Sequence, residues 1–314
     1  MSYTFLDLAL DVLSDEKMPL TYIEIWKIGL EKGFTKKLLT EGKTPWQSLG
    51  ARIYVDIRDN PKSKLIKVGK NPARFFLASK KDEIKDISNE VIDKKESKSS
   101  QYKERDLHPV LTYFAYADLA FTHERPIYTK TIFHEKSTQT GYQGWTHPDI
   151  VGFSTPIEEW SADVLDFNEM TDKNALSVFS FELKKSITKT NYRESFFQAV
   201  SNSSWANQGY LVTAEIPDDN EELMGELDRL SSSFGIGIIH LNLSDIAESK
   251  VIYPAQIKKQ LDWETINKIA TQNSDFNNFL KSMKIDIRAR KIHRSEYDEV
   301  VTDIDEYVVT VGKL

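Results

Sequence analysis

Two carboxylates and one ammonium group lie at the ends of short apolar runs in the middle of the chain. Asp149 precedes the apolar run 150–153, and Glu182 and Lys184 end the run SVFSFELKK. Carboxylate oxygens are the ligands that hard cations such as Mg²⁺ prefer, and the sequence has no cysteine that could supply thiolate ligands. These three residues are therefore candidates for metal-assisted hydrolysis.

Strand parity places Glu182 and Lys184 on the same face of the strand. Side chains alternate between the two faces of a strand. One face then carries Ser177, Phe179, Phe181 and Leu183, and the other carries Leu176, Val178, Ser180, Glu182 and Lys184. The second face begins apolar and ends charged, as expected for a strand that is covered at its middle and open at its end. Glu-x-Lys occurs five times in the chain, and only the triplet at Glu182 closes an apolar strand. An exposed structural ion pair is the alternative.

The stretch THPDIVGF, which contains Asp149, lies upstream of this Glu-x-Lys triplet. Together the two motifs resemble the PD-(D/E)XK nuclease superfamily, which includes the restriction endonucleases. The resemblance implies that Asp149 and Glu182 bind Mg²⁺, for which Mn²⁺ is a possible substitute. It also implies that the backbone carbonyl of Leu183 adds a ligand and that Lys184 assists the attacking water.

Two further site residues follow from the same resemblance. Many members carry a glutamine on the helix after Glu-x-Lys, and Gln198 matches that position. One branch has a tyrosine four residues later, where this chain has Asn202. Glu104 resembles a helical carboxylate that some members add to the metal site, and its alternative role is a solvated charge at the start of a helix.

The gap between Asp149 and Glu182 is long for this superfamily. Residues 154–174 would have to form an insertion, and its acidic side chains are rival ligands: Asp163, Asp166 and Glu169. His147 and His240 are interpreted as ordinary residues, because the sequence shows neither a helical histidine pair nor a compact histidine cluster.

Strands and helices alternate along residues 104–314. Strands are expected near 127–133, 149–153, 176–184, 210–214 and 237–243, and helices near 106–119, 192–205 and 221–232, with helical spacing again at 263–283. This order predicts an α/β domain with a central mixed sheet. With the resemblance above, we expect it to be restriction-endonuclease-like.

Residues 1–79 are predicted to form a winged helix, mainly α with a small β-wing. Apolar residues recur at helical spacing from Phe5, Thr21 and Glu24 form a capping box before a second helix, and Pro45 opens a third. Two short strands then flank a turn at 69–73. Residues 80–103 are dense in charge and poor in apolar groups, and are predicted to be a linker.

This amino-terminal part is basic, whereas the rest of the chain is acidic. Through Lys80 there are 14 Lys and Arg against 9 Asp and Glu, which leaves a net charge of −12 for the remainder. The third helix of a winged helix usually enters the major groove, and its basic wing contacts phosphates. The candidate DNA-binding residues are Gln47, Ser48, Arg52, Lys64, Lys67, Lys70 and Arg74. A winged helix used for protein contacts or as a scaffold is the alternative.

The pattern FLDLALDVLSDEKMPLTYIEIWKIGLEKGF, with PWQSLGARIYVDIRDNP and ARFFLA, resembles the HARE helix-turn-helix family. That resemblance implies binding to double-stranded DNA, and it leaves open whether modified bases are recognised. With both resemblances combined, the chain is similar to the HrgA-type proteins associated with restriction loci.

The leading hypothesis is a Mg²⁺-dependent DNA endonuclease of the restriction or defence type, similar to type II restriction endonucleases. Cutting both strands requires two sites, so a homodimer is expected. The main alternative is a non-catalytic, DNA-binding transcriptional regulator whose degenerate nuclease fold serves for dimerisation. A third hypothesis is an RNA nuclease or a DNA-repair nuclease that uses the same residues.

The composition is that of a soluble globular protein, with 40% hydrophobic and 28% charged residues. No apolar run approaches the roughly 18 residues of a membrane span, and the amino terminus does not resemble a signal peptide. A cytoplasmic protein without membrane contact is expected. The sequence has neither a Walker-type phosphate-binding loop nor a Gly-x-Ser-x-Gly motif, so it gives no support to nucleotide-driven translocation or serine hydrolysis.

Overall fold

The computed structural model describes residues 3–38, 45–68, 73–84, 102–122, 125–136, 147–171, 175–217, 220–243 and 245–311. The chain forms two compact units, one built mainly of residues 1–101 and the other of residues 102–243 and 249–307. None of the described helices is both long enough and apolar enough to cross a membrane.

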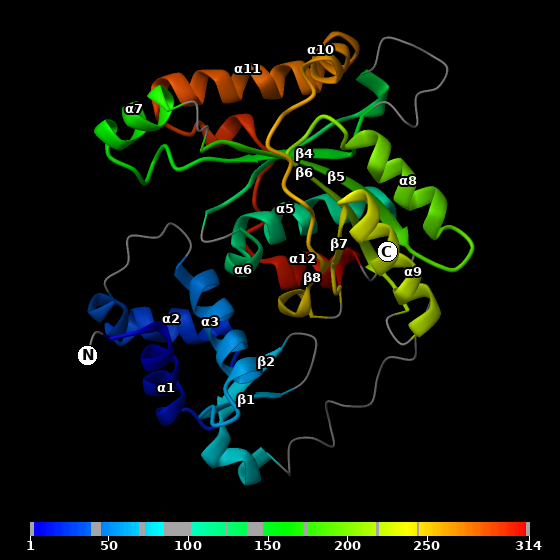
Figure 1. Cartoon of the computed structure of the whole chain (residues 1–314). Coiled ribbons are helices and arrows are strands. Elements are labelled where there is room, and N and C mark those ends of the chain that lie inside the picture. Colours follow the sequence, from blue (N-terminus) through cyan, green and yellow to red (C-terminus); the bar gives the residue numbers. More distant parts are fainter. Residues whose placement is uncertain are drawn as a thin grey trace. The chain divides into compact units, whose positions relative to one another are not determined.

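The amino-terminal unit has the predicted order of helices and strands (Figure 1). Its elements are α1 (Phe5–Asp15), α2 (Tyr22–Glu31), η1 (Phe34–Lys37), α3 (Pro45–Asp59), β1 (Leu65–Val68), β2 (Arg74–Leu77) and η2 (Ala78–Ile84). The capping box expected at Thr21 is present, because the backbone N–H of Glu24 donates to its hydroxyl at 3.2 Å. β1 and β2 pair in antiparallel register, and the fully buried Phe75 and Phe76 bring the hairpin into the core with α1, α2 and α3.

Lys80, the first residue of the predicted linker, contacts this unit. Its ammonium group donates to the carbonyls of Leu13, Ser14 and Glu16 at 2.7 to 3.2 Å, at the carboxyl end of α1. A cation at this end is favourable because the last carbonyls of a helix have no partner within the helix. Residues 85–101, which make up most of the predicted linker, lie outside the described residues.

The second unit contains a mixed sheet, in which the described residues form six strands. Their spatial order follows the sequence: β3 (Tyr128–Thr131), β4 (Ile150–Ser154), β5 (Ser177–Ser186), β6 (Gln208–Glu215), β7 (Gly237–His240) and β8 (Lys250–Tyr253). The strands β5, β6 and β7 are parallel, and the pairs β3–β4, β4–β5 and β7–β8 are antiparallel. The prediction of an α/β domain with a mixed sheet is confirmed.

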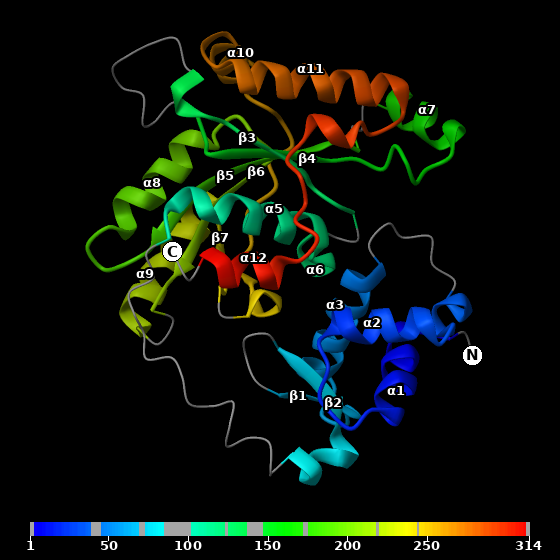
Figure 2. The ribbon, with the colours of Figure 1, turned by 180° about the vertical axis from the view of Figure 1, so that it is seen from behind.

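Helices cover both faces of this sheet. The helices after residue 102 are α5 (His108–Ala117), α6 (Leu119–Thr122), α7 (Ala162–Met170), α8 (Tyr192–Asn202), α9 (Glu221–Phe234), α10 (Trp263–Gln272), α11 (Ser274–Ala289) and α12 (Ile304–Val311), with short 3₁₀ turns η3 (Glu104–Leu107), η4 (His134–Lys136), η6 (Ile246–Glu248) and η7 (Arg294–Glu296). Figures 1 and 2 show α10 and α11 on one face and α5 on the opposite face.

The side chains that alternate along the strands pack against these two layers. On the face of α6, Phe121 packs edge-on against Phe181 and Tyr210. On the other face, Phe153 and Val178 share a buried cluster with Phe276 of α11. Leu211 lies on the same side of the sheet as Val178, and it packs under α8 and α9.

The helical spacing at 263–283 conceals a break. The structure contains two helices there, α10 and α11, separated by Asn273 in an extended conformation. The Asn273 side chain accepts the backbone N–H groups of Asp275 and Phe276 at 2.9 and 3.2 Å, which caps the new helix. Because both helices turn their apolar side chains to the same cluster, the break leaves the hydrophobic period nearly unchanged.

Candidate functional site

The strand register brings Asp149 and Glu182 together. In the antiparallel pair β4–β5, Ile150 is opposite Phe181, so Asp149, the residue before β4, lies opposite Glu182. Directly opposed residues of an antiparallel pair project to the same face. The carboxylate of Asp149 also accepts the backbone N–H of Leu183 at 2.8 Å. The long insertion therefore does not keep the two carboxylates apart.

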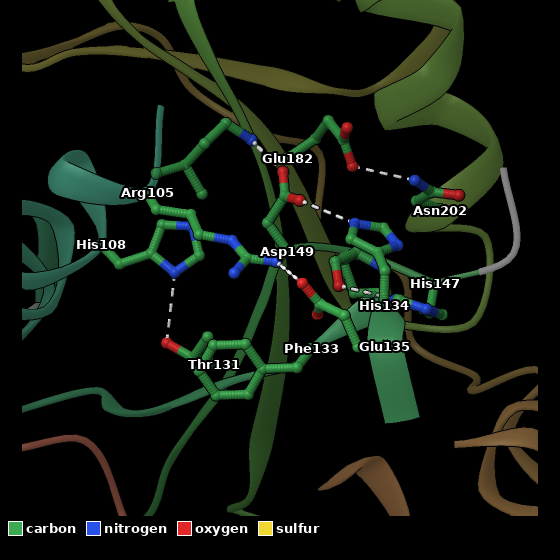
Figure 3. A network of polar contacts seen from close by, with 12 residues as sticks. Arg105, His108, Thr131, Phe133, His134, Glu135, His147, Asp149, Glu182 and Asn202 are labelled. Carbon is green, nitrogen blue, oxygen red and sulfur yellow. Dashed lines mark hydrogen bonds and ion pairs between the residues drawn. The ribbon is translucent and has the colours of Figure 1, made fainter. Parts of the chain in front are cut away.

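Glu182 is held by two donors. Its Oε1 accepts from Lys184 Nζ at 2.8 Å. Its Oε2 accepts from Asn202 Nδ2 at 2.8 Å (Figure 3). The residue is only 2% exposed. Burial and the nearby negative charge of Asp149 raise the pKa of Glu182 to about 7, against the opposing effect of Lys184. Two carboxylates thus lie close together, and the nearby positive charge does not fully compensate their negative charge.

Asp149 has a different environment from its neighbour. Burial raises its pKa, but hydrogen bonds from His134 and the Leu183 N–H, with the charge of Lys184, outweigh burial and hold the pKa of Asp149 below its usual range. Asp149 Oδ1 lies 3.3 Å from His134 Nε2. The pKa values of the two carboxylates therefore shift in opposite directions, which is common in functional sites.

Lys184 and Glu104 complete the charged cluster. Burial lowers the pKa of Lys184, but Glu182, Asp149 and Glu104 together raise it, so Lys184 remains an ammonium group. Burial and the charge of Asp149 raise the pKa of Glu104 above its ordinary value, against the opposing effects of Lys184 and the backbone N–H of Lys185. Glu104 lies in η3, which precedes α5. Lys185 is not part of this charged cluster. Its ammonium group lies over the ring of Tyr102, 4.5 Å from the ring centroid.

Three histidines surround Asp149, and sequence reasoning missed two of them entirely. His134 stacks on His147 with ring centroids 4.4 Å apart, although 13 positions separate the two residues. His108 Nδ1 lies 3.3 Å from Thr131 Oγ1, and that hydroxyl donates to Asp298 at 3.1 Å. The interpretation of His147 as an ordinary residue did not include its stacking on His134. Only the fold brings these sequence-distant rings together.

The helix α8 contributes Asn202 to the site. Asn202 is 2% exposed and donates to Glu182, whereas Gln198 lies one turn earlier and is half-buried. Sequence reasoning treated Asn202 as a departure from a family pattern. Its four-residue spacing from Gln198 was the signal that could have placed it in the site.

The rival acidic residues lie on α7. Asp163, Asp166 and Glu169 are all exposed, and Asp166 forms an ion pair with Arg290. Within the described part of the chain, no group of three His, Cys, Asp or Glu side chains is arranged to hold a metal ion. A hard cation nevertheless suits the chemistry of the site, because Asp149 and Glu182 offer oxygen donors and repel each other.

The predicted DNA-binding residues that the structure describes lie on α3, on β1 and β2, and just before β1. Ser48 and the exposed Arg52 are on α3, Lys67 is on β1, and the exposed Lys64 precedes that strand. Arg74 on β2 binds within the unit, donating to Glu24 at 2.9 Å and to the Pro19 carbonyl at 3.1 Å. Lys70 and the side chain of Gln47 lie outside the described residues.

Comparison with known proteins identifies one part of the chain. Residues 3–76 match the HARE-HTH family model, whose description names ASXL and a restriction endonuclease HTH domain. No curated protein and no solved structure matches the chain. The amino-terminal unit therefore contains a HARE-HTH domain, a helix–turn–helix type that suggests DNA binding.

Proposed function

We propose that the chain is a Mg²⁺-dependent nuclease that acts on DNA bound by its HARE-HTH domain. The observation that carries the proposal is the opposition of Asp149 and Glu182 across β4 and β5, with Lys184 hydrogen-bonded to Glu182. These residues have the types and the order of the PD-(D/E)XK motif. The description of the family that matches residues 3–76 names a restriction endonuclease HTH domain, a helix-turn-helix module that would deliver DNA to such a site.

Each residue has a defined task in phosphodiester hydrolysis. Asp149 and Glu182 would hold the cation, with Glu104 and the Leu183 carbonyl as further oxygen donors. The bound cation would lower the pKa of a water molecule and offset negative charge on the phosphorus in the transition state. Lys184 remains protonated beside Glu182, so it can orient the attacking water and offset the charge of the phosphate.

Three finer features belong to the same proposal. Cleavage of both strands would require two sites and hence a homodimer. Mn²⁺ would replace Mg²⁺, because both cations accept oxygen ligands. The restriction or defence role and the recognition of modified bases rest on the HARE-HTH match and the sequence resemblance.

Cleavage assays test the proposal directly. Purified protein is incubated with plain and cytosine-modified duplex DNA and with RNA, with Mg²⁺ or with a chelator. Glu182→Gln and Lys184→Ala are expected to abolish Mg²⁺-dependent cleavage, whereas Asp163→Asn, which changes an exposed acid of α7, keeps wild-type activity. If the wild type cuts none of the substrates, or if Glu182→Gln cuts as well as the wild type, the nuclease assignment is wrong.

A non-catalytic DNA-binding regulator is the second candidate. It is favoured by the contacts of Glu182, because Lys184 and Asn202 already occupy both of its oxygens. A regulator binds DNA with an affinity that falls as salt rises, and it does so without cleavage. Calorimetry with Mn²⁺ separates the candidates: the nuclease loses Mn²⁺ binding in Asp149→Asn, and the regulator shows no binding that this substitution could remove.

A further inference from the structure

The last residue of α8, Asn202, is fixed to the same strand that carries Glu182. Its backbone carbonyl accepts the hydroxyl of Ser180 at 3.0 Å and the indole N–H of Trp205 at 2.8 Å. Ser180 and Glu182 are two positions apart on β5, so they project to the same face. The end of α8 is therefore attached to β5 at Ser180, two residues before the candidate metal ligand Glu182.

A glycine on the next strand allows this close approach. A Cβ atom at Gly209 of β6 would lie 2.3 Å from the Cβ and Oγ of Ser203, the residue that follows α8. Real Cβ atoms do not come that close to another atom, so a larger residue would displace the end of α8. Gly209 is also the register partner of Ser180. Two neighbouring strands thus fix the position of Asn202.

The side chain of Asn202 is only half satisfied. The amide donates from Nδ2 to Glu182 at 2.8 Å, which is the orientation that an ionised carboxylate requires, because such a group only accepts hydrogen bonds. Its Oδ1 is then buried without a hydrogen-bond partner among the described residues. An unsatisfied buried acceptor destabilises the folded state, because it has lost its hydrogen bonds to water. A residue selected for stability alone would not leave this atom unpaired.

A second asparagine nearby shows the satisfied arrangement. Asn207, in the turn between α8 and β6, accepts the backbone N–H of Val178 at 2.9 Å and donates to the Lys258 carbonyl at 2.8 Å. Both ends of its amide are therefore bonded to backbone groups. Asn207 connects loops and strands, whereas Asn202 binds a single carboxylate oxygen.

We propose that Asn202 is the positioning residue of Glu182, and that it holds the carboxylate with Oε2 towards α8 so that Oε1 is presented to Lys184 and to a divalent cation. This inference rests on the proposed metal-dependent function and assigns a residue that the family motif does not provide. Asn202 acts through Glu182 and touches neither substrate nor cation. Without its amide, Glu182 is free to leave the geometry in which Asp149 and Glu182 converge.

The inference predicts that function and stability separate at this position. Asn202→Leu removes the donor for Glu182 and also the unsatisfied Oδ1, at nearly the same side-chain size. The two changes in stability oppose each other, so we expect thermal unfolding close to the wild-type temperature and a loss of Mn²⁺ affinity of roughly 10- to 100-fold, the range typical of residues that orient metal ligands. Asn207→Leu, the matched control, is expected to unfold at a lower temperature and to bind Mn²⁺ like the wild type.

The experiment is a Mn²⁺ titration of the full chain by calorimetry, with thermal unfolding of each variant in chelator. Asn202→Ala is the second variant, because it needs no room for a branched side chain. If a folded Asn202 variant binds Mn²⁺ with wild-type affinity, the positioning role is wrong while the proposed function stands. If the wild type binds no Mn²⁺, the proposed metal-dependent function is wrong and the role of Asn202 falls with it.

Discussion

Two buried aspartates, both in the unit that contains the six-stranded sheet, each contact a histidine ring, and their surroundings differ. Asp286 on α11 is fully buried and accepts from His293 Nδ1 at 2.6 Å, from the His293 N–H at 3.2 Å and from the Tyr297 hydroxyl at 2.7 Å. Asp149 is 8% exposed and lies opposite Glu182. One aspartate is surrounded by donors, and the other faces a second carboxylate.

We interpret Asp286 as a structural carboxylate and Asp149 as the candidate functional one. Asp286 closes the loop after α11, where Arg290 adopts a left-handed conformation with φ of 52°, and all the contacts named above stabilise the folded chain. At Asp149 the folded chain keeps two carboxylates close together, and burial together with the charge of Asp149 raises the pKa of Glu182 to about 7. Burial of charge therefore does not identify a site by itself. Incompletely compensated charge is the more informative sign.

The largest expected effect is the loss of catalysis in Asp149→Asn. The amide oxygen of the introduced side chain can still accept the Leu183 N–H, so the fold is retained, but under the proposed function the cation would lose one charged ligand. Mg²⁺-dependent cleavage should fall by about 1000-fold or more, which corresponds to roughly 4 kcal/mol of transition-state stabilisation. Cleavage rates at saturating Mg²⁺ test this. Wild-type rates in this variant would place Asp149 with Asp286 as a structural residue.

The opposite result is expected for Asp286→Ala. This change leaves the Tyr297 hydroxyl and the His293 ring without their shared acceptor, so the free energy of unfolding should fall by roughly 3 kcal/mol. Urea denaturation measures the loss. Cleavage per folded molecule should stay within about threefold of the wild type, because about 0.7 kcal/mol or less is then lost from the transition state. A larger catalytic loss without destabilisation would contradict the comparison.

Local rules predicted the two strands, and the resemblance to the PD-(D/E)XK motif paired their carboxylates. Alternation along a strand put Glu182 and Lys184 on one face, and the apolar run after Asp149 marked a neighbouring strand. The order of elements in the amino-terminal unit also follows from local signals, such as the capping box at Thr21. Register between strands then determined whether Asp149 and Glu182 meet, and no local signal specifies register across a 33-residue separation.

The residues that sequence reasoning missed reach the site from other elements. His134 is positioned by η4 and His108 by α5, and each comes near Asp149 only after the sheet has formed. The break between α10 and α11 was missed for a related reason. A residue that caps a helix can lie within an uninterrupted pattern of apolar residues at helical spacing. Long-range packing determines these features, whereas composition and periodicity report neighbours along the chain.

The pH dependence of stability offers a third test of uncompensated charge. Burial and Asp149 raise the pKa of Glu182 to about 7 from an ordinary value of 4.5, so the folded state binds this proton more tightly than the unfolded state does. In chelator, the free energy of unfolding should therefore fall as the pH rises from 4.5 to about 7, by roughly 2 kcal/mol from this group.

The variant Glu182→Gln should lack this part of the pH dependence. Denaturation of the wild type and the variant near pH 5 and near pH 8 gives the difference, since these values bracket most of the window in which Glu182 titrates. An identical pH dependence in wild type and Glu182→Gln would mean that the carboxylate charges are already compensated.

The smallest expected effects are those of the two histidines. His293→Ala removes a ring that donates to Asp286 at 2.6 Å, so it should lower the free energy of unfolding by about 1 to 2 kcal/mol without changing Mn²⁺ affinity. His134→Ala removes a longer contact of 3.3 Å from a partly exposed ring, so its effect on stability should be below about 1 kcal/mol. Because His134 orients Asp149, its loss should weaken Mn²⁺ binding several-fold. Equal behaviour of the two variants in calorimetry and denaturation would remove the distinction between the two aspartates.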